Sequence, residues 1–285
     1  MEILTHRQGE PEWEEWRRMF VGASDAPVIM QDSPYKTPYR LFLEKAGLEI
    51  PKVNASMTYG RNREAYVRDR YESESGYKVY PRCAVHSEIH WMIASFDGIT
   101  LDKSWIVELK CANKEDHRIA LEGRVPDKYW AQVQHQLEVA NLERMHYVSF
   151  HEGDLAIVDV ERNPDYIERL IKTEFEFYEM VLTRTPPFLT DRDFQKRDDD
   201  EWSQVAAQWR EISIERKHIE AQERLLAAKL KELAAGSPTE GNGVRVSQIT
   251  RRGGLNEEEL SKVVDLNTFR KPDSAYWKLE QVGGE

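Results

Sequence analysis

The sequence is poor in cysteine, with Cys83 and Cys111 as the only two thiols among 285 residues. Two thiols are too few for a disulfide framework, for a four-thiolate zinc site or for an iron–sulfur cluster held by four cysteines. We therefore expect a protein of a reducing compartment that holds no iron–sulfur cluster. We interpret Cys111 as a small buried residue.

Long hydrophobic runs are also missing. No stretch of about 18 apolar residues occurs, so the sequence predicts no transmembrane helix. The first residues, MEILTHRQGEPEWEEW, lack the order of basic, apolar and small residues that marks a signal peptide. We therefore expect a soluble, cytoplasmic protein with no membrane partner.

Basic residues are fewer than acidic residues. The chain has 40 Lys and Arg residues and 51 Asp and Glu residues, which gives a formal net charge of −11. This balance argues against a protein that coats nucleic acid indiscriminately, since phosphate binding depends on a local concentration of basic side chains. A basic channel confined to one part of the surface remains allowed. Arg61, Arg63 and Lys114 are candidates to line such a channel.

Helical patterns dominate the first part of the chain, over residues 11–19, 37–48 and 59–76. Extended segments follow, interrupted by a helix over residues 129–140. Strands broken by a helix predict an α/β core with a central mixed β-sheet flanked by helices. A further helix closed by two prolines ends this first domain, which we place at residues 1–198.

Residues 199–235 follow a different pattern, in which apolar side chains recur with alternating spacings of three and four. This spacing predicts a coiled-coil-like or docking helix, although Arg216 and Glu223 interrupt the apolar seam. Residues 234–243 read as a flexible break, and residues 236–285 as a small C-terminal element of unassigned role with a strand near residues 243–250. In that element Tyr276 and Trp277 either stack on single-stranded bases or close a small core.

Charged residues occupy two predicted strands. In ASFDGIT, Asp97 precedes a glycine, and in WIVELK the strand alternation places Glu108 and Lys110 on one face. Asp97 and Glu108 lie far enough apart in sequence for the chain to turn and bring them together. Two carboxylates beside a backbone carbonyl form an oxygen site for Mg²⁺, and Lys110 could orient water or hold a phosphate. The other interpretation is a hairpin with an exposed Glu–Lys pair.

The flanking motifs carry a resemblance. ASFDG and VELKC, preceded by YGRNREAYVRDRYE and followed by KYWAQVQHQLEVA, resemble the phage lambda exonuclease and YqaJ-like viral recombinase family of the PD-(D/E)XK nuclease superfamily, over roughly residues 11–188. The resemblance implies a restriction-endonuclease-like core and a bacteriophage or prophage protein that acts in the cytoplasm of a bacterial host.

The resemblance also implies a metal site. Asp97 and Glu108 would bind the metal through their side chains, and Leu109 through its backbone carbonyl. Lys110 would activate or position the attacking water. Glu64 matches a helix glutamate that family members direct towards the metal, often through water. Its other interpretation is an ordinary acid on a solvent-facing helix.

The remaining motifs concern the DNA strand. Tyr129 and Gln132 match a Tyr-x-x-Gln pair that lines the active site beside the substrate strand, although two residues one turn apart could simply pack and cap. Arg17 and Ser24 match an arginine and a serine that bind DNA phosphate, with the adjacent Arg18 as the alternative arginine. Ser24 could also serve as a helix N-cap.

The resemblance thus implies a Mg²⁺-dependent 5′-to-3′ exonuclease that acts on double-stranded DNA ends, with Mn²⁺ as a substitute, and that leaves 3′ single-stranded overhangs for recombination. It implies a homo-oligomer, expected as a ring-shaped trimer, and a single-strand annealing protein as partner. The residues alone indicate a metal-assisted phosphodiesterase. Two alternatives stay open: a structure- or sequence-specific endonuclease on the same core, and a noncatalytic DNA-binding or recruitment protein.

Overall fold

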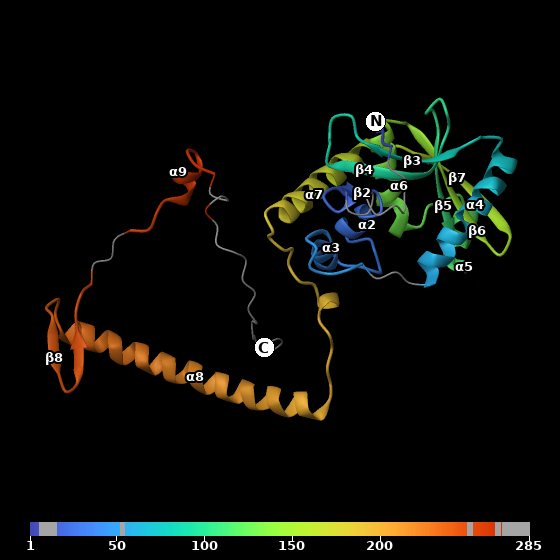
Figure 1. Ribbon diagram of the computed structural model, residues 1–285. Helices are drawn as coiled ribbons and strands as arrows, with labels where there is room; N and C mark the ends of the chain where they lie inside the picture. Colours follow the sequence, from blue (N-terminus) through green and yellow to red (C-terminus); the bar gives the residue numbers. More distant parts are fainter. Residues whose placement is uncertain (6–15, 52–54, 250–252, 266–268, 270–285) are drawn as a thin grey trace. The chain divides into compact units, whose positions relative to one another are not determined.

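The computed structural model describes residues 1–5, 16–51, 55–249, 253–265 and 269 (Figure 1). The chain divides into two compact units, Met1–Gln195 and Lys196–Glu285. Most of the helix predicted over residues 11–19 lies outside the described residues, as do Tyr276 and Trp277. The finer division that we placed at residue 235 stays a prediction.

A seven-stranded mixed sheet forms the centre of the first unit (Figure 1). Along its main path the strands run in the order β1, β3, β4, β5, β6, β7, and β2 pairs with β4. The β5–β6 and β2–β4 pairs are parallel, whereas the other pairs are antiparallel. The strands are β1 (Glu2–Ile3), β2 (Val21–Gly22), β3 (Tyr80–Val85), β4 (Met92–Ile99), β5 (Ile106–Cys111), β6 (Arg144–His151) and β7 (Asp154–Glu161).

Two helices make the crossover that the parallel pair β5–β6 requires, namely α5 (Lys114–Leu121) and α6 (Asp127–Ala140). The sequence analysis predicted α6 but not α5. Asn113 marks the start of α5, because its side chain accepts a hydrogen bond from the backbone N–H of Asp116 at 2.9 Å. The crossover matters for function because it brings α6 onto the sheet beside the charged part of β5.

Helices cover both faces of the sheet. On one face α4 (Ala55–Ser75) packs Val67 and Tyr71 against residues of β5 and β6 such as Val107 and Val148. On the other face α6 contributes Val133 and Leu137 to the largest core cluster, together with residues of β4 and β6. The charged strand β5 therefore runs between two apolar layers.

Gly98 permits the close packing of β4 at this point. A Cβ atom added there would lie 2.5 Å from Cγ2 of Val79 and 2.7 Å from Cγ1 of Val107. Both neighbours are buried in the core, so neither can move aside easily. The glycine after Asp97 is thus a packing requirement of the sheet as well as part of the sequence motif.

Three further helices lie in the described part of the first unit: α2 (Ala26–Ile29), α3 (Pro38–Lys45) and α7 (Pro164–Leu182). Thr37 caps α3 by accepting a hydrogen bond from the backbone N–H of Arg40, and Pro38 follows at the first helical position. These helices form a core cluster of their own, which includes Val28, Phe42 and Phe177. A short 3₁₀ turn, η1 (Asp191–Asp193), precedes the end of the unit.

The second unit contains the long helix α8 (Asp200–Leu233), the hairpin β8 (Thr239–Gly241) and β9 (Val244–Val246), and α9 (Glu257–Ser261). The flexible break predicted over residues 234–243 is partly wrong, because β8 lies within it. Asn242 and Gly243 form the turn with positive φ angles of 48° and 80°, the geometry that an Asn-Gly pair favours in a two-residue hairpin. The strand predicted near residues 243–250 is limited to the three residues of β9.

No helix in the described parts of the chain combines the length and the apolar character needed to cross a membrane.

Candidate active site

The register of β4 and β5 brings the predicted acids together. The two strands are antiparallel, with Gly98 opposite Val107, so the chain segments that carry Asp97 and Glu108 adjoin. The Asp97 carboxylate accepts a hydrogen bond from the backbone N–H of Leu109 at 2.8 Å. Asp97 is 9% exposed and Glu108 is 2% exposed, so both carboxylates lie in the protein interior.

Three donors surround Glu108. Gln132 Nε2 and Lys110 Nζ both contact its Oε1, at 2.6 Å and 2.5 Å, and Gln136 Nε2 donates to its Oε2 at 2.5 Å. As the strand alternation predicted, Glu108 and Lys110 lie on one face. Gln136 is a residue that the sequence analysis missed. Its spacing of four from Gln132 on a predicted helix was the available signal.

The electrostatics of the site show a surplus of negative charge. Burial and the neighbouring Glu108 and Glu64 carboxylates raise the pKa of Asp97 well above its usual range, against the opposing effect of Lys110. Burial alone would lower the pKa of Lys110, but Glu108 and Asp97 raise it above its ordinary value. Lys110 is therefore held as a cation, and it does not fully neutralise the acids around it.

Tyr129 lies beside Lys110 and links it to further residues. Lys110 Nζ is 5.0 Å from the centre of the Tyr129 ring, and Lys128 Nζ is 5.2 Å from the same ring. Lys128 also donates a hydrogen bond to the Tyr35 hydroxyl at 3.0 Å and forms an ion pair with Asp116 at 2.7 Å. The sequence analysis missed Lys128 and Tyr35, because residues 93 positions apart become neighbours only in the fold.

Glu64 reaches this region from α4. It forms an ion pair with Arg68, one helical turn further on, and Arg68 Nε donates to the backbone carbonyl of Asp97 at 2.9 Å. Glu64 also contributes to the raised pKa of Asp97. The structure thus places Glu64 near Asp97 but engaged with Arg68, and its predicted role at a metal stays a prediction.

The donor set fits a hard divalent cation. Asp97, Glu108 and the Leu109 carbonyl supply oxygen atoms only, which suits Mg²⁺. A divalent cation would offset the burial and the carboxylate repulsion that together raise the pKa of Asp97. Within the described residues no group of three or more His, Cys, Asp or Glu side chains is arranged to hold a metal ion. A cation here would therefore rely on two carboxylates, a backbone carbonyl and water.

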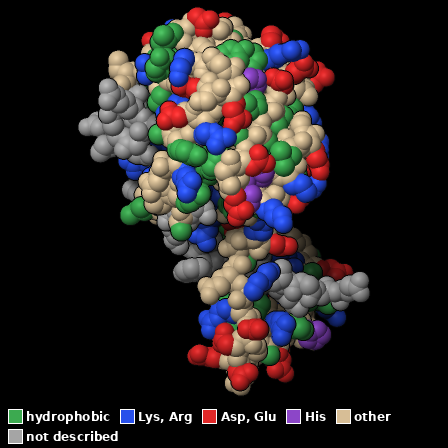
Figure 2. Space-filling model, turned by 90° about the vertical axis from the view of Figure 1, so that its right-hand side faces the viewer, with side chains coloured by type: hydrophobic (Ala, Val, Ile, Leu, Met, Phe, Trp, Pro, Cys, Tyr) green, Lys and Arg blue, Asp and Glu red, His purple; other side chains and the backbone are tan. Residues whose placement is uncertain are grey.

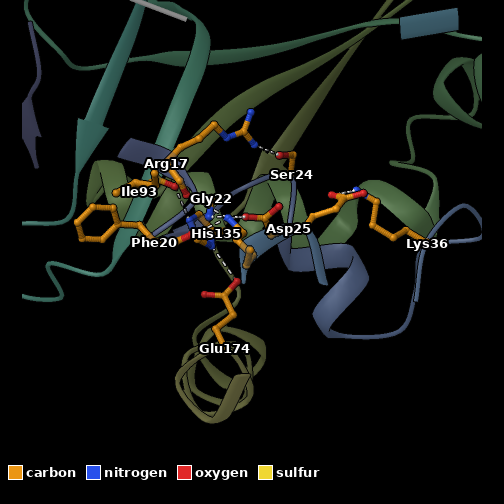
Figure 3. Close-up of polar contacts among 11 residues, drawn as sticks. Arg17, Phe20, Gly22, Ser24, Asp25, Lys36, Ile93, His135 and Glu174 are labelled. Atoms are coloured by element: carbon orange, nitrogen blue, oxygen red, sulfur yellow. Dashed lines mark hydrogen bonds and ion pairs between the residues drawn. The ribbon is translucent and has the colours of Figure 1, made fainter. Parts of the chain in front are cut away.

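Arg17 and Ser24, predicted as a phosphate-binding pair, are in contact: Arg17 Nη2 donates to Ser24 Oγ at 3.0 Å (Figure 3). Ser24 is exposed, and it directly precedes Asp25, the N-cap residue of α2. The alternative role of Ser24 as the N-cap is therefore wrong for this helix. The exposed Arg18 has no contact with Ser24 among the hydrogen bonds of the described residues.

A buried ion pair holds the segment that carries Arg17 and Ser24 in place. The Asp25 carboxylate contacts Lys45 Nζ at 2.5 Å and accepts a hydrogen bond from the Gly22 N–H at 2.9 Å. Lys45 also donates to the carbonyl oxygens of Phe20, at 2.6 Å, and Arg17, at 3.2 Å. The backbone that carries Arg17 is therefore tied to α3 by Lys45.

A second buried pair lies beside the first (Figure 3). His135 on α6 contacts Glu174 on α7 at 2.8 Å through Nδ1, and its Nε2 donates to the Ile93 carbonyl on β4 at 2.8 Å. Burial alone would lower the pKa of His135, but the Glu174 carboxylate raises it. This pair joins two helices and the sheet, which agrees with a structural role for His135.

Comparison with known proteins finds similarity to one family. Residues 12–143 match the model of the YqaJ-like viral recombinase domain. Over 201 residues the chain is 31% identical to the uncharacterized protein YqaJ of Bacillus subtilis (strain 168), and the match covers 66% of this chain and 62% of YqaJ. The chain thus spans less than two thirds of the length of that relative.

Solved structures agree on the fold. An alkaline exonuclease from Laribacter hongkongensis, LHK-Exo, superposes with a TM-score of 0.54 at 23% identity, over 61% of this chain and 94% of that protein. LHK-Exo in complex with dAMP gives the same values. The predicted PD-(D/E)XK-type α/β fold, a central mixed sheet flanked by helices, is thereby confirmed. Over residues 12–143 the chain is thus similar to the YqaJ-like viral recombinase family, in agreement with the resemblance of its motifs.

Proposed function

We propose that the protein is a metal-dependent deoxyribonuclease that degrades one strand of double-stranded DNA from its 5′ end and leaves a 3′ overhang. The observation that carries the proposal is the group of buried Asp97 and Glu108 with the half-buried Lys110 at the junction of β4 and β5, with Gln132 bound to Glu108. Two carboxylates and a lysine in this arrangement suit phosphodiester hydrolysis. The relatives named above support a nuclease, because one of them is an alkaline exonuclease.

In this proposal Asp97, Glu108 and the Leu109 carbonyl would hold Mg²⁺, or Mn²⁺ as a substitute. The ion would supply Lewis acidity and lower the pKa of a bound water. Lys110, held as a cation, would orient that water or the scissile phosphate. Gln132 and Gln136 would fix the orientation of the Glu108 carboxylate through their hydrogen bonds.

The surface charge fits a confined DNA site. On the face drawn in Figure 2, Lys and Arg side chains are interspersed with Asp and Glu side chains and do not form one broad basic patch. DNA binding would then depend on a few placed contacts, such as Lys128 beside Tyr129 and the Arg17–Ser24 pair. The ring-shaped trimer and the single-strand annealing partner are proposals that rest on the family resemblance.

The test is digestion of three DNA substrates: linear duplex with a 5′-phosphate, the same duplex with a 5′-hydroxyl, and a covalently closed circle. We expect Mg²⁺-dependent shortening of the phosphorylated linear duplex from its 5′ ends, and complete loss of activity with EDTA. Cleavage of the closed circle would favour the endonuclease alternative. If no substrate is cut with Mg²⁺ or Mn²⁺, the protein is not a nuclease.

A second prediction concerns the 5′-phosphate. Replacing Arg17 by alanine should lower the preference for the phosphorylated end by roughly 10- to 100-fold, because a hydrogen bond to a charged group contributes about 1.5–3 kcal/mol. The measurement is the ratio of kcat/KM for the two linear substrates. Arg18→Ala is the matched control and should leave the ratio unchanged. A loss of preference in Arg18→Ala alone would assign the phosphate to the neighbouring arginine.

A further inference from the structure

Ten residues form one seam along α8, at alternating spacings of three and four residues. This 3.5-residue repeat is the pattern of a helix that packs along its whole length against another helix. The α8 seam consists of Trp202, Val205, Trp209, Ile212, Arg216, Ile219, Glu223, Leu226, Leu230 and Leu233.

The α8 seam is uncovered. None of the 34 residues of α8 is buried, and Ile212 and Leu226 are 65% and 64% exposed. Most of the stability of a protein helix comes from packing of its apolar face. We therefore expect the exposed seam of this long helix to pack against a partner. A row of exposed apolar side chains on a surface is also typical of an interaction site.

The two charged seam residues exclude one arrangement of two identical helices. With Trp202 assigned to heptad position a, Arg216 and Glu223 also occupy a positions. In a parallel pair each a residue meets the same residue of the other chain, which would place two arginines together and two glutamates together. Buried like charges are strongly unfavourable, so α8 is unsuited to a parallel pair with itself.

An antiparallel pair reduces this conflict, although the two Arg216 side chains then lie in adjacent central layers. When two copies of α8 overlap along the whole seam, Arg216 packs beside Ile219 of the second copy, and the adjacent layer contains Glu223 of the second copy. Arg216 and Glu223 of opposite chains then become neighbours of opposite charge. Arg216 now binds Glu220 at 2.5 Å, but this exposed pair within one helix is weak and leaves the guanidinium available.

The sizes of the apolar residues also match in this register. Trp202 meets Leu233 of the second copy, and Trp209 meets Leu226 of the second copy. A parallel pair would instead place each tryptophan against the same tryptophan, where two large rings crowd one layer. The antiparallel register therefore combines large with medium side chains in the outer layers, and it places the layers that contain Glu223 on either side of the two central layers that contain Arg216.

We propose that α8 binds α8 of a second copy of this chain as an antiparallel two-stranded coiled coil, in the register that overlaps the whole seam. The partner of the α8 seam is thus a second copy of this chain, and the charges of Arg216 and Glu223 determine the antiparallel direction. This interface contains no residue of the proposed nuclease site, so the dimer proposal can be tested independently of nuclease activity.

Cysteine cross-linking of the full chain tests the direction and the register. Val205→Cys and Leu230→Cys chains are oxidised separately and after mixing, and products are separated without reductant. We expect a disulfide-linked dimer only in the mixture, because position 205 meets position 230 of the other copy. The matched control is Ala207→Cys mixed with Ala228→Cys, which has the same register but faces outward. The unmodified chain, with Cys83 and Cys111, is the background control.

Charge reversal gives a second readout by sedimentation of the full chain. Arg216→Glu should raise the dimer dissociation constant at least ~10-fold, because it places two acids together, and adding Glu223→Arg should restore pairing. Far-UV circular dichroism verifies that α8 still forms in each variant. Cross-linking of either single cysteine variant with itself, or a chain that stays monomeric without cross-links in the mixture, would overturn the proposal.

Discussion

Replacing Glu108 by glutamine is expected to reduce the rate of DNA hydrolysis by roughly 1000-fold or more. The amide has nearly the same size as the carboxylate but carries no charge, so it binds a divalent cation poorly. A catalytic metal stabilises the transition state by several kcal/mol, and each 1.36 kcal/mol corresponds to a tenfold change in rate. The measurement is the single-turnover rate on the phosphorylated linear duplex at saturating Mg²⁺.

Two comparisons separate loss of chemistry from loss of structure. Glu115→Gln, which changes an exposed acid on α5 that forms an ion pair with Arg118, is the matched control and should retain full activity. Thermal melting of Glu108→Gln should remain cooperative, because the glutamine oxygen can still accept the hydrogen bonds of Gln132 and Lys110. If Glu108→Gln folds and retains more than about a tenth of the activity, Glu108 is not a metal ligand of the reaction.

The charged hairpin shows how far local sequence information extends. Alternation along a strand was sufficient to place Glu108 and Lys110 on one face, and the structure brings Asp97 to the same place through hydrogen bonding to Leu109. Helical spacing likewise indicated that Gln132 and Tyr129 would lie together on α6. These inferences work because strand and helix periodicities fix which side chains share a face.

Contacts between segments that are distant in sequence could not be predicted from strand or helix periodicity. Tyr35 and Lys128 meet because the loop before α3 lies against the start of α6, and nothing in either segment indicates this. The two lysines around the Tyr129 ring follow from the same arrangement. Polar residues in a loop are read as solvent-exposed until the fold supplies a partner.

Charged residues in the core were hidden for another reason. Lys45 looks like an ordinary charge in the last turn of an amphipathic helix, and Asp25 looks like a helix cap. In the structure the two side chains are only 7% and 9% exposed and bind each other. A buried ion pair has no sequence signature, because its burial depends on which helices pack around it.

Replacing Asp25 by asparagine is expected to lower the free energy of unfolding by about 3–5 kcal/mol, because it leaves the Lys45 ammonium buried without a counter-charge. Asparagine can still accept the hydrogen bond of the Gly22 N–H, so the loss falls mainly on the ion pair. Urea unfolding at neutral pH, followed by circular dichroism, measures the change. Glu161→Gln, in an exposed ion pair with Arg144, should cost less than about 1 kcal/mol.

The pH dependence adds an independent check. Burial alone would raise the pKa of Asp25, but Lys45 and Arg17 lower it below its ordinary value. The carboxylate therefore contributes its full stabilisation above the unfolded-state pKa of about 3.9, and this contribution is lost as the pH falls through the lower folded-state pKa. The difference in stability between the unmodified protein and Asp25→Asn should accordingly shrink in acid.

The double variant Asp25→Asn with Lys45→Met separates an uncompensated charge from lost packing. If the buried ammonium causes the damage, removing it together with its partner should recover part of the stability lost in Asp25→Asn. It should not restore the anchoring of the Arg17 backbone, since Lys45 no longer donates to the Phe20 and Arg17 carbonyls. A double variant as unstable as the sum of both single changes would show that the pair acts through packing, and that its charges contribute little.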